Sequence, residues 1–506
     1  MQSAPSLAAI APVLNVDREQ YEQAIAAIHE LIAAGDTYQV NYTCHARWSG
    51  HIDPLEYFLA LARSHPVPYA AYLNLGEVQV LSLSPELFLR KRGRCLETKP
   101  MKGTRPRGRT LEEDTELAQD LVSSEKDRAE NLMILDMARN DLGRICVVGS
   151  VAVPARFTAE RYRSVWQMTS TVTGELRPGV GLREVFAATF PGASITGAPK
   201  ARTMEIIHEL EPEPRGVYTG ALGVFWPSGD FTLNLPIRTL VHRDGQWDLG
   251  IGAGIVWDSR AGSEYEETLL KASFALRLLP DLRLWETILL TEEREYTFLE
   301  EHLARLRRSA EYWGFSLEEG MVRDRLAELA ASAQELPLAV RLELDQEGEV
   351  QLTPRPAPSA PPGPVRVLLS AQRTDSRDRL LYHKTNQRAL YDEERQQAQA
   401  RGCAEVIFHN ERGELTEGAI TNLFVRLDGQ WLTPPRSAAL LPGIWREAFL
   451  REHEGREQEL TVSRLQEAEA IVVGNSVRVA MEVGEVLDGE GRVLWPKPAE
   501  GGTILR

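Results

Sequence analysis

The proline-dense stretch PRPAPSAPPGP at residues 354–364 limits how this chain can fold more than any other feature. Proline has a fixed φ and no backbone N–H, so the stretch prevents a helix or an interior strand and favours an extended spacer. The pattern also changes near 279–280, and a new strand-like run begins at 284–290. We therefore predict domains at 1–281 and 282–506, the second with subdomains at about 282–356 and 365–506 around a linker at 354–364.

Length and composition support more than one domain in an ordinary globular protein. A chain of 506 residues is too long for a single hydrophobic core. Its formal net charge of -16 disfavours nucleic acid or an anionic membrane as the main partner. Neither a signal-peptide pattern nor a long apolar run is present. The four cysteines are scattered without a C-x-x-C pair, which indicates reduced thiols and a cytoplasmic location.

Hydrophobic periodicity predicts helices and strands in both halves of the chain. An amphipathic helix is expected at 17–34, a helix-rich region at 112–142 and another helix at 262–279. Alternating or apolar runs bounded by turn residues predict strands. The expected strands lie at 38–46, 69–75, 78–83, 284–290, and three or four within 216–257.

Several small-residue and basic segments of the first half could bind an anion. Lys102 is expected in a turn bounded by proline and glycine, where a lysine is ordinarily a solvated charge. The glycines at 250–254 predict a turn whose N–H groups can approach a carboxylate. The loop at 191–200 opens a helix, a common anion site. Arg238 could bind a carboxylate in a bidentate manner, or it could be a charge at a sheet edge.

Three glutamates could converge on a metal ion. Glu264 and Glu267 are three positions apart on one face of a predicted helix, and Glu130 lies in another. Carboxylates from two helices suit Mg²⁺, a hard cation that prefers oxygen ligands. By spacing alone, these residues could equally belong to solvated helix faces.

Together, the motifs of the first half resemble the chorismate-utilising enzymes, which include anthranilate, aminodeoxychorismate, isochorismate and salicylate synthases. The resemblance covers nearly all of residues 15–278 and implies an α+β fold, a sandwich of two large antiparallel sheets. The motifs that carry it are SLSPELF at 82–88, KGTRPR at 102–107, ENLM at 130–133, RNDLG at 139–143, SITGAPK at 194–200, GAGIV at 252–256 and the segment 264–271.

The resemblance implies a role for each matching residue. Glu130, Glu264 and Glu267 match magnesium ligands; in the family, the metal holds the ring carboxylate and helps a C4 substituent leave. Residues expected to bind the substrate, chorismate, are Arg238, Gly252, Ala253, Gly254, Lys271 and Thr196.

Lys102 occupies the position that separates members of this family. Anthranilate synthases typically have alanine there, whereas in aminodeoxychorismate synthases a lysine attacks C2 of chorismate and the C4 hydroxyl leaves. Glu86 matches the carboxyl group that helps the hydroxyl depart. Isochorismate and salicylate synthases also carry a lysine, which activates water, so these activities remain alternatives for the first half.

Two further features bear on the reaction of the first half. Gln167 stands where anthranilate synthases have a histidine tied to pyruvate elimination, so the resemblance implies that the site stops at aminodeoxychorismate. None of the four cysteines lies in the Gly-x-Cys-x-Gly turn of a glutaminase nucleophile. We therefore expect ammonia to come from a separate glutamine amidotransferase subunit.

The second half contains the residue types that pyridoxal phosphate requires. Such enzymes need a lysine that links the cofactor, an acid at the pyridine nitrogen and donors for the phosphate. A hairpin is predicted at 405–425, with a turn at 410–413. The sequence of this half resembles the fold-type IV (class IV aminotransferase-like) family over about 284–490. The motifs that carry the resemblance are EHLARL at 301–306, Lys384, TEGAITNLF at 416–424, LPGIWR at 441–446 and GNSVR at 474–478.

This second resemblance implies a two-subdomain α/β unit that binds pyridoxal phosphate, with a homodimer as one possible assembly. Lys384 would be both the cofactor-linking lysine and the catalytic base, Glu417 the acid at the pyridine nitrogen and Arg305 a phosphate ligand. Threonine is common in relatives where Trp445 stands, so its backbone N–H is expected to serve instead of its side chain. The other expected cofactor contacts are Ile444 and Ser476.

The two resemblances together predict a bifunctional enzyme of folate biosynthesis. The first half would convert chorismate and ammonia to aminodeoxychorismate, and the second would release pyruvate to leave 4-aminobenzoate. One alternative is an isochorismate- or salicylate-type synthase fused to a class IV aminotransferase. Another is a second half that acts only as a binding module.

Overall fold

The computed structural model describes residues 12–276, 278, 281–359 and 361–495. The chain divides into two compact units at Asp281 and Leu282. The second unit also takes in Gly108–Asp114, which the sequence did not suggest. Within that unit, Leu111 packs against the hydrophobic core, and the Tyr312 hydroxyl donates a hydrogen bond to the carbonyl oxygen of Gly108.

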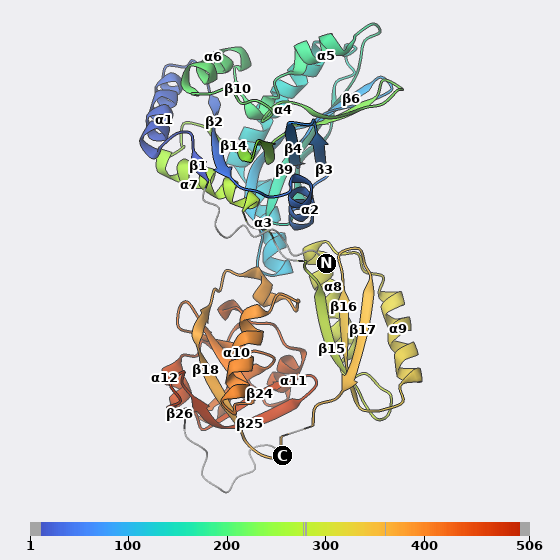
Figure 1. Ribbon diagram of the computed structural model, residues 1–506, viewed down its shortest axis with the longest axis vertical. Coiled ribbons are helices and arrows are strands. Elements are labelled where there is room, and N and C mark those ends of the chain that lie inside the picture. The colour runs from blue at the N-terminus through green and yellow to red at the C-terminus, as the bar shows by residue number, and fades with distance from the viewer. Residues whose placement is uncertain (1–11, 277, 279–280, 360, 496–506) are drawn as a thin grey trace. The chain divides into compact units, whose positions relative to one another are not determined.

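Two antiparallel sheets form the first unit (Figure 1). Its strands are β1 (Val13–Leu14), β2 (Gln39–Ser49), β3 (Tyr69–Asn74), β4 (Val78–Ser84), β5 (Leu87–Arg92), β6 (Cys95–Lys99), β7 (Met101–Pro106), β8 (Ala152–Arg161), β9 (Val165–Glu175), β10 (Gly197–Ala198), β11 (Leu222–Phe225), β12 (Phe231–Asn234), β13 (Thr239–Arg243) and β14 (Gln246–Ile255). One sheet has the order β1-β2-β14-β13-β4-β3, with β10 added to β2, and the other has the order β11-β12-β5-β6-β9-β7, with β8 added to β9. The predicted α+β class and the pair of antiparallel sheets are confirmed.

Side-chain N-caps mark the starts of several helices of this unit. The helix expected at 17–34 is confirmed as α1 (Arg18–Ala33), and it starts with a capping box between Asp17 and Gln20. It buries Tyr21, whose ring packs edge-on against Tyr265 of a neighbouring helix. The other helices are α2 (Pro54–Ser64), α4 (Glu125–Gly143), α5 (Leu182–Thr189), α6 (Lys200–Leu210) and α7 (Ala261–Ala272). Helix α3 (Leu111–Ser123) begins in the second unit and continues in the first from Thr115.

The second unit begins with a small antiparallel sheet of β15 (Leu284–Leu290), β16 (Leu338–Leu344) and β17 (Val350–Pro356). Helices α8 (Leu299–Trp313) and α9 (Glu319–Ser332) accompany it (Figure 1). The proline-dense stretch begins inside β17. Proline is tolerated there because β17 is an edge strand, so Pro354 and Pro356 need not donate a hydrogen bond to a further strand. Residue 360, within the expected linker, lies outside the described residues.

A mixed sheet completes the second unit. Strand β18 runs parallel to both of its neighbours, β19 and β25, and α10 packs against β18 and β19 (Figure 1). The elements of this part are β18 (Val365–Thr374), β19 (Glu405–Asn410), β20 (Leu415–Gly418), β21 (Asn422–Leu427), β22 (Gln430–Thr433), β23 (Arg456–Glu457), β24 (Ala470–Asn475), β25 (Val479–Leu487) and β26 (Val493–Trp495), with α10 (Ala389–Ala400), α11 (Ile444–Glu452) and α12 (Val462–Gln466).

The chain lacks a helix suited to crossing a bilayer in the portion that the structure describes. Its four cysteines are free thiols: Cys95 is exposed, and Cys44, Cys146 and Cys403 are buried.

Candidate active sites

Lys102 lies in a bulged strand, so the predicted turn at this residue is wrong. In the pairing with β9, Met101 lies opposite Thr169 and Thr104 lies opposite Gln167. Lys102 and Gly103 therefore share one opposing residue, Met168. Gly103 has φ of 94°, a value that favours glycine. The bulge therefore takes the Lys102 side chain out of the ordinary alternation of the strand.

Asn131 of α4 supports this bulge through its side-chain amide, a role that was not among the predicted ones. Its side-chain amide donates to the carbonyl oxygens of Lys102 and Met168, each at 3.3 Å. The Ser170 hydroxyl donates to its amide oxygen at 2.6 Å. The ENLM motif is the signal that could have indicated Asn131, because this residue follows a candidate metal ligand. A buried asparagine needs hydrogen-bond partners, which here are the backbone of the bulge and Ser170.

The Lys102 amine lies against the glycine-rich part of β14. A Cβ on Gly254 would stand 2.5 Å from Nζ of Lys102, so a larger residue there would require the lysine amine to shift. The predicted turn at 250–254 is wrong, because these residues continue β14. Since β13 pairs with β14 only as far as Leu249, the strand has a free edge beyond that point among the described residues. That edge offers the backbone groups that the turn was expected to supply.

Burial lowers the pKa of Lys102, although the charges of Glu130 and Glu86 oppose the shift. The positive charge of Lys271 contributes to the lowering. Lys271 donates to the carbonyl oxygen of Gly252 at 3.0 Å and pairs with Glu267 at 2.8 Å. Lys102 is thereby biased toward the neutral amine that a nucleophile requires.

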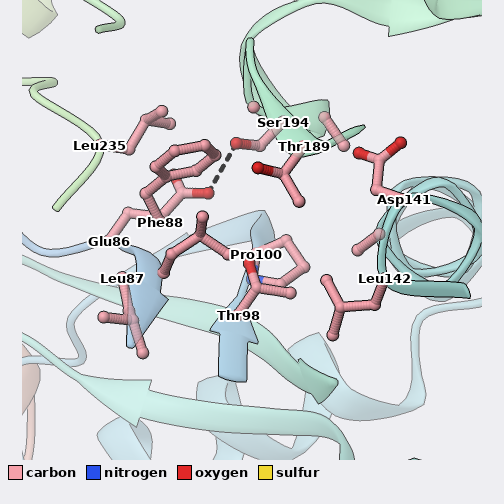
Figure 2. Close-up of a pocket in the computed structure, with 14 residues that line it drawn as sticks. Glu86, Leu87, Phe88, Thr98, Pro100, Asp141, Leu142, Thr189, Ser194 and Leu235 are labelled. Atoms are coloured by element: carbon pink, nitrogen blue, oxygen red, sulfur yellow. Dashed lines mark hydrogen bonds between the residues drawn. The ribbon is translucent and has the colours of Figure 1, made fainter. Parts of the chain in front are cut away.

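Glu86 is buried between β4 and β5 (Figure 2). The Ser194 hydroxyl donates to its Oε1 at 2.6 Å, the dashed contact in Figure 2. Burial raises the pKa of Glu86 to about 7, against the opposing effects of Ser194, Lys102 and the N–H of Met101. A cavity of about 20 Å³, enough for one water, adjoins this pair and reaches Asp141. Glu86 is therefore poised to give or take a proton near neutral pH.

The remaining substrate-binding candidates lie in the same unit, in different settings. Arg238 has φ of 49° just before β13, and burial lowers the pKa of its guanidinium. Such a conformation is costly for a residue other than glycine and is typical of functional sites. The Thr196 hydroxyl donates to the carbonyl oxygen of Gly192 at 3.0 Å, so it already has a local partner. Their roles toward the substrate stay predictions.

The three proposed magnesium glutamates come from α4 and α7. Burial raises the pKa of Glu130, and the charge of Glu264 adds to the rise while Lys102 opposes it. Among the described residues, no three acidic, histidine or cysteine side chains gather closely enough to hold a metal. The oxygen-only donor set and the repulsion between Glu130 and Glu264 fit a divalent cation. The metal site stays a prediction.

The second unit has its own cavity, of about 280 Å³, near the lower end of small-molecule sites. Six predicted cofactor residues line it: Lys384, Glu417, Arg305, Ile444, Trp445 and Ser476.

Lys384 is fixed by its backbone at the edge of the small sheet. Its carbonyl oxygen accepts a hydrogen bond from the N–H of Trp285 at 2.8 Å. Burial lowers its pKa to about 7, and the charges of Arg305, Arg388 and Arg341 contribute while Glu286 opposes. A substantial fraction of the amine is therefore neutral at neutral pH.

Glu286 of β15 positions Arg305, a role that no motif of the sequence indicated. Arg305 donates to both carboxylate oxygens of Glu286, at 2.8 and 2.6 Å, and His302 lies 2.7 Å from the same carboxylate. Burial alone would raise the pKa of Glu286, but these neighbours lower it to about 2. Arg305 also donates to the Pro442 carbonyl oxygen at 3.1 Å, so its guanidinium is held firmly beside the cavity.

Glu417 lies at a break in the predicted hairpin. The second strand divides into β20 and β21, because Glu405 accepts hydrogen bonds from the N–H of Ile420 and the hydroxyl of Thr421 and so supports a turn. Burial raises the pKa of Glu417 to about 8, while hydrogen bonds to it and nearby positive charges oppose the rise. Tyr391 donates to this carboxyl group at 3.3 Å.

The start of α11 supplies backbone donors to the same cavity. Ile444 and Trp445 occupy its first turn, where N–H groups have no partner within the helix. The Trp445 ring packs edge-on against Phe424 in the core, in agreement with a backbone role. Ser476 lies between β24 and β25 on the cavity wall. A lysine, an acid and a helix start in one cavity fit pyridoxal phosphate.

Comparison with known proteins agrees with this division of the chain. Residues 5–277 match the family of chorismate binding enzymes, and residues 283–486 match class IV aminotransferases. Aminodeoxychorismate synthase component 1 of Bacillus subtilis is 44% identical over 267 residues, 53% of this chain and 57% of that protein. Anthranilate synthase component 1 of Haloarcula marismortui is 45% identical over 254 residues, 50% of this chain and 52% of that protein.

A solved structure, anthranilate synthase component I from Streptococcus pneumoniae, matches with a TM-score of 0.50 and 34% identity over 54% of this chain and 60% of its own. This chain spans little more than half the length of these relatives. The chain belongs to the chorismate binding enzyme family. In it, a class IV aminotransferase domain follows the chorismate-binding domain.

Proposed function

We propose that this protein makes 4-aminobenzoate from chorismate and ammonia in two steps, one in each unit. Lys102 is the observation that carries the proposal, because its amine lies against Gly254 of β14 and its pKa is lowered by burial. The relatives named aminodeoxychorismate synthase support the same first step.

In the first step, Nζ of Lys102 attacks C2 of chorismate, both ring double bonds shift, and the C4 hydroxyl leaves. Glu86 donates the proton with which that hydroxyl departs as water, a role that its pKa of about 7 supports. Ammonia then adds at C4, both double bonds shift back, and the Lys102 amine leaves C2. The product is aminodeoxychorismate, and Lys102 returns to its starting state.

Arg238 and the backbone of Gly252–Gly254 would orient the enolpyruvyl carboxylate during this step. Glu130, Glu264 and Glu267 would hold Mg²⁺, which supplies Lewis-acid polarisation when bound. Gln167 donates to the Thr104 hydroxyl at 3.0 Å beside the bulge and offers no group that titrates near neutral pH. Its presence supports a site that does not go on to eliminate pyruvate.

Ammonia would come from a separate glutaminase subunit. Burial raises the pKa of Cys44, Cys146 and Cys403, which disfavours the thiolate needed to attack glutamine. Cys95 is exposed at the start of β6 rather than on a tight glycine turn. Relatives described as "component 1" support a partner subunit. The free thiols support a cytoplasmic setting.

In the second step, pyruvate leaves aminodeoxychorismate and the ring becomes aromatic. Lys384, Glu417, Arg305 and the start of α11 would hold pyridoxal phosphate. When bound, this cofactor supplies an electron sink at the substrate amine. Lys384 removes the C4 proton, the bond from C3 to the ether oxygen breaks, and pyruvate departs. A pKa of about 7 lets Lys384 accept that proton near neutral pH.

The deciding experiment supplies the full chain with chorismate, Mg²⁺, pyridoxal phosphate and ammonium, and identifies the products. We expect 4-aminobenzoate and pyruvate from the unaltered protein. Lys384→Ala should accumulate aminodeoxychorismate, and Lys102→Ala should consume no chorismate while still converting supplied aminodeoxychorismate. Isochorismate, salicylate or anthranilate as the main product would overturn the proposal.

A further inference from the structure

Four arginines line the cavity of the second unit besides Arg305. The single acidic residue that lines it, among those the structure describes, is Glu417, whose pKa of about 8 keeps much of it protonated at neutral pH. This positive lining occurs in a chain with a formal net charge of -16, so it does not follow from composition. The four are Arg341, Arg388, Arg395 and Arg478.

Arg341 and Arg388 form one pair, on the side of Lys384. The Arg341 guanidinium lies over the Trp285 ring, 4.1 Å from its centroid. Burial, Arg355 and Arg388 lower its pKa, against the opposing charges of Glu343 and Asp392. Both arginines also lower the pKa of Lys384, which places them near the reactive amine.

Arg395 and Arg478 form the second pair. Nε of Arg395 is buried and has no hydrogen-bond partner among the described residues. Burial and the charge of Arg395 lower the pKa of Arg478. Glu405 is the acid whose charge opposes this shift, but burial raises the pKa of Glu405 itself. Little negative charge from the protein therefore offsets the positive charge of the second pair.

We propose that the substrate of this cavity carries two carboxylates and that each arginine pair binds one of them. Guanidinium groups bind carboxylates through paired charge-assisted hydrogen bonds. A cofactor phosphate would be served by Arg305 and the start of α11, and a monocarboxylic amino acid would leave one of these half-buried pairs without a carboxylate to bind. The inference rests on the proposed second reaction, whose substrate is a dicarboxylate, and it names the residues that select that substrate.

The test measures binding of two unreactive probes to the full chain loaded with pyridoxal phosphate. The probes are 3-(carboxymethoxy)benzoate, with two carboxylates, and 3-methoxybenzoate, with one. Perturbation of the cofactor's visible absorption reports occupancy of this cavity and is blind to the first unit. We expect the diacid to bind at least about tenfold more tightly, the effect of one added charged contact.

Variants assign that preference to the two pairs. Arg341→Gln and Arg478→Gln should each bring the affinity ratio of the two probes close to one, and Arg341→Lys should retain part of it. Arg377→Gln, at a side chain that is 85% exposed, should keep the original ratio. An unchanged cofactor spectrum shows that each variant is folded.

Equal affinity of the unaltered protein for both probes would overturn the inference, as would a ratio that persists in both glutamine variants. Conversion of supplied aminodeoxychorismate to 4-aminobenzoate is measured separately. If the diacid preference holds but no 4-aminobenzoate forms, the proposed second reaction fails and the dicarboxylate inference stands. If 4-aminobenzoate forms without a diacid preference, the inference alone fails.

Discussion

Protonation of Glu86 depends on its burial and, among its neighbours, on the Ser194 hydroxyl 2.6 Å away. That hydrogen bond stabilises the carboxylate and holds the pKa of Glu86 below the value that burial alone would give. As the proton donor of the first step, Glu86 is active when protonated, so activity declines as pH rises through about 7. In Ser194→Ala, the pKa of Glu86 rises, and we expect the alkaline decline of aminodeoxychorismate formation to move up by about one pH unit.

Ser194→Thr is the matched control, because threonine keeps the hydroxyl donor. It should leave the decline close to its original pH, whereas a purely structural role would lower the rate without moving the profile. Measurement of kcat over pH, with ammonia corrected for its own protonation, separates the two. A profile that does not move in Ser194→Ala would contradict the role given to Ser194.

At the scale of elements, α4 fixes the bulge of β7 through Asn131. Asn131→Ala would leave the carbonyl oxygens of Lys102 and Met168 and the Ser170 hydroxyl without their present partner. An unsatisfied buried polar group costs about 1–3 kcal/mol. We expect the variant to unfold at lower denaturant concentration and to lose most activity of the first step. Leu132→Ala, at the next and 42% exposed position of α4, should do neither.

The approach of β7 to β14 can be tested in the same way at Gly254. A Cβ at this position would stand 2.5 Å from Nζ of Lys102, so Gly254→Ala should displace the amine. We expect loss of chorismate consumption by at least about tenfold, the rate cost of a small misplacement of a reacting group. Gly143→Ala, where a Cβ meets nothing within 4 Å, should retain activity. Full activity in Gly254→Ala would contradict the position of Lys102.

At the scale of the whole molecule, each unit has its own sheets, its own core and its own candidate site. We therefore expect Lys102→Ala and Lys384→Ala proteins, mixed together, to make 4-aminobenzoate that neither makes from chorismate alone. A lag should precede the product, because aminodeoxychorismate must leave one molecule and enter another. A time course of 4-aminobenzoate fluorescence measures it. No product from the mixture, when each variant keeps its own half-reaction, would show that the intermediate does not pass through solution.

Local sequence patterns were enough to predict many of the helices and strands. The helix at 17–34 and the strands at 38–46, 69–75 and 78–83 were predicted from patterns that their own residues carry. The motifs also led to the two families, whose models match 5–277 and 283–486. Two local predictions were wrong, the turns at Lys102 and at 250–254, because glycine and proline are typical of turns but also permit a bulge and a close approach between strands.

The motifs of the sequence were enough to predict which residues react: Lys102, Glu86, Lys384 and Glu417. The pKa values of these residues could not be predicted in the same way, because they depend on the folded chain. The shifts in pKa depend on burial and on partners that are distant in sequence, such as Ser194 for Glu86 and Arg305 for Lys384. The two arginine pairs could not be predicted from the sequence either, because their members are distant from one another in the chain. Their members come from β16, from α10 and its N-cap, and from the β24–β25 turn, and only folding brings such charges to one cavity.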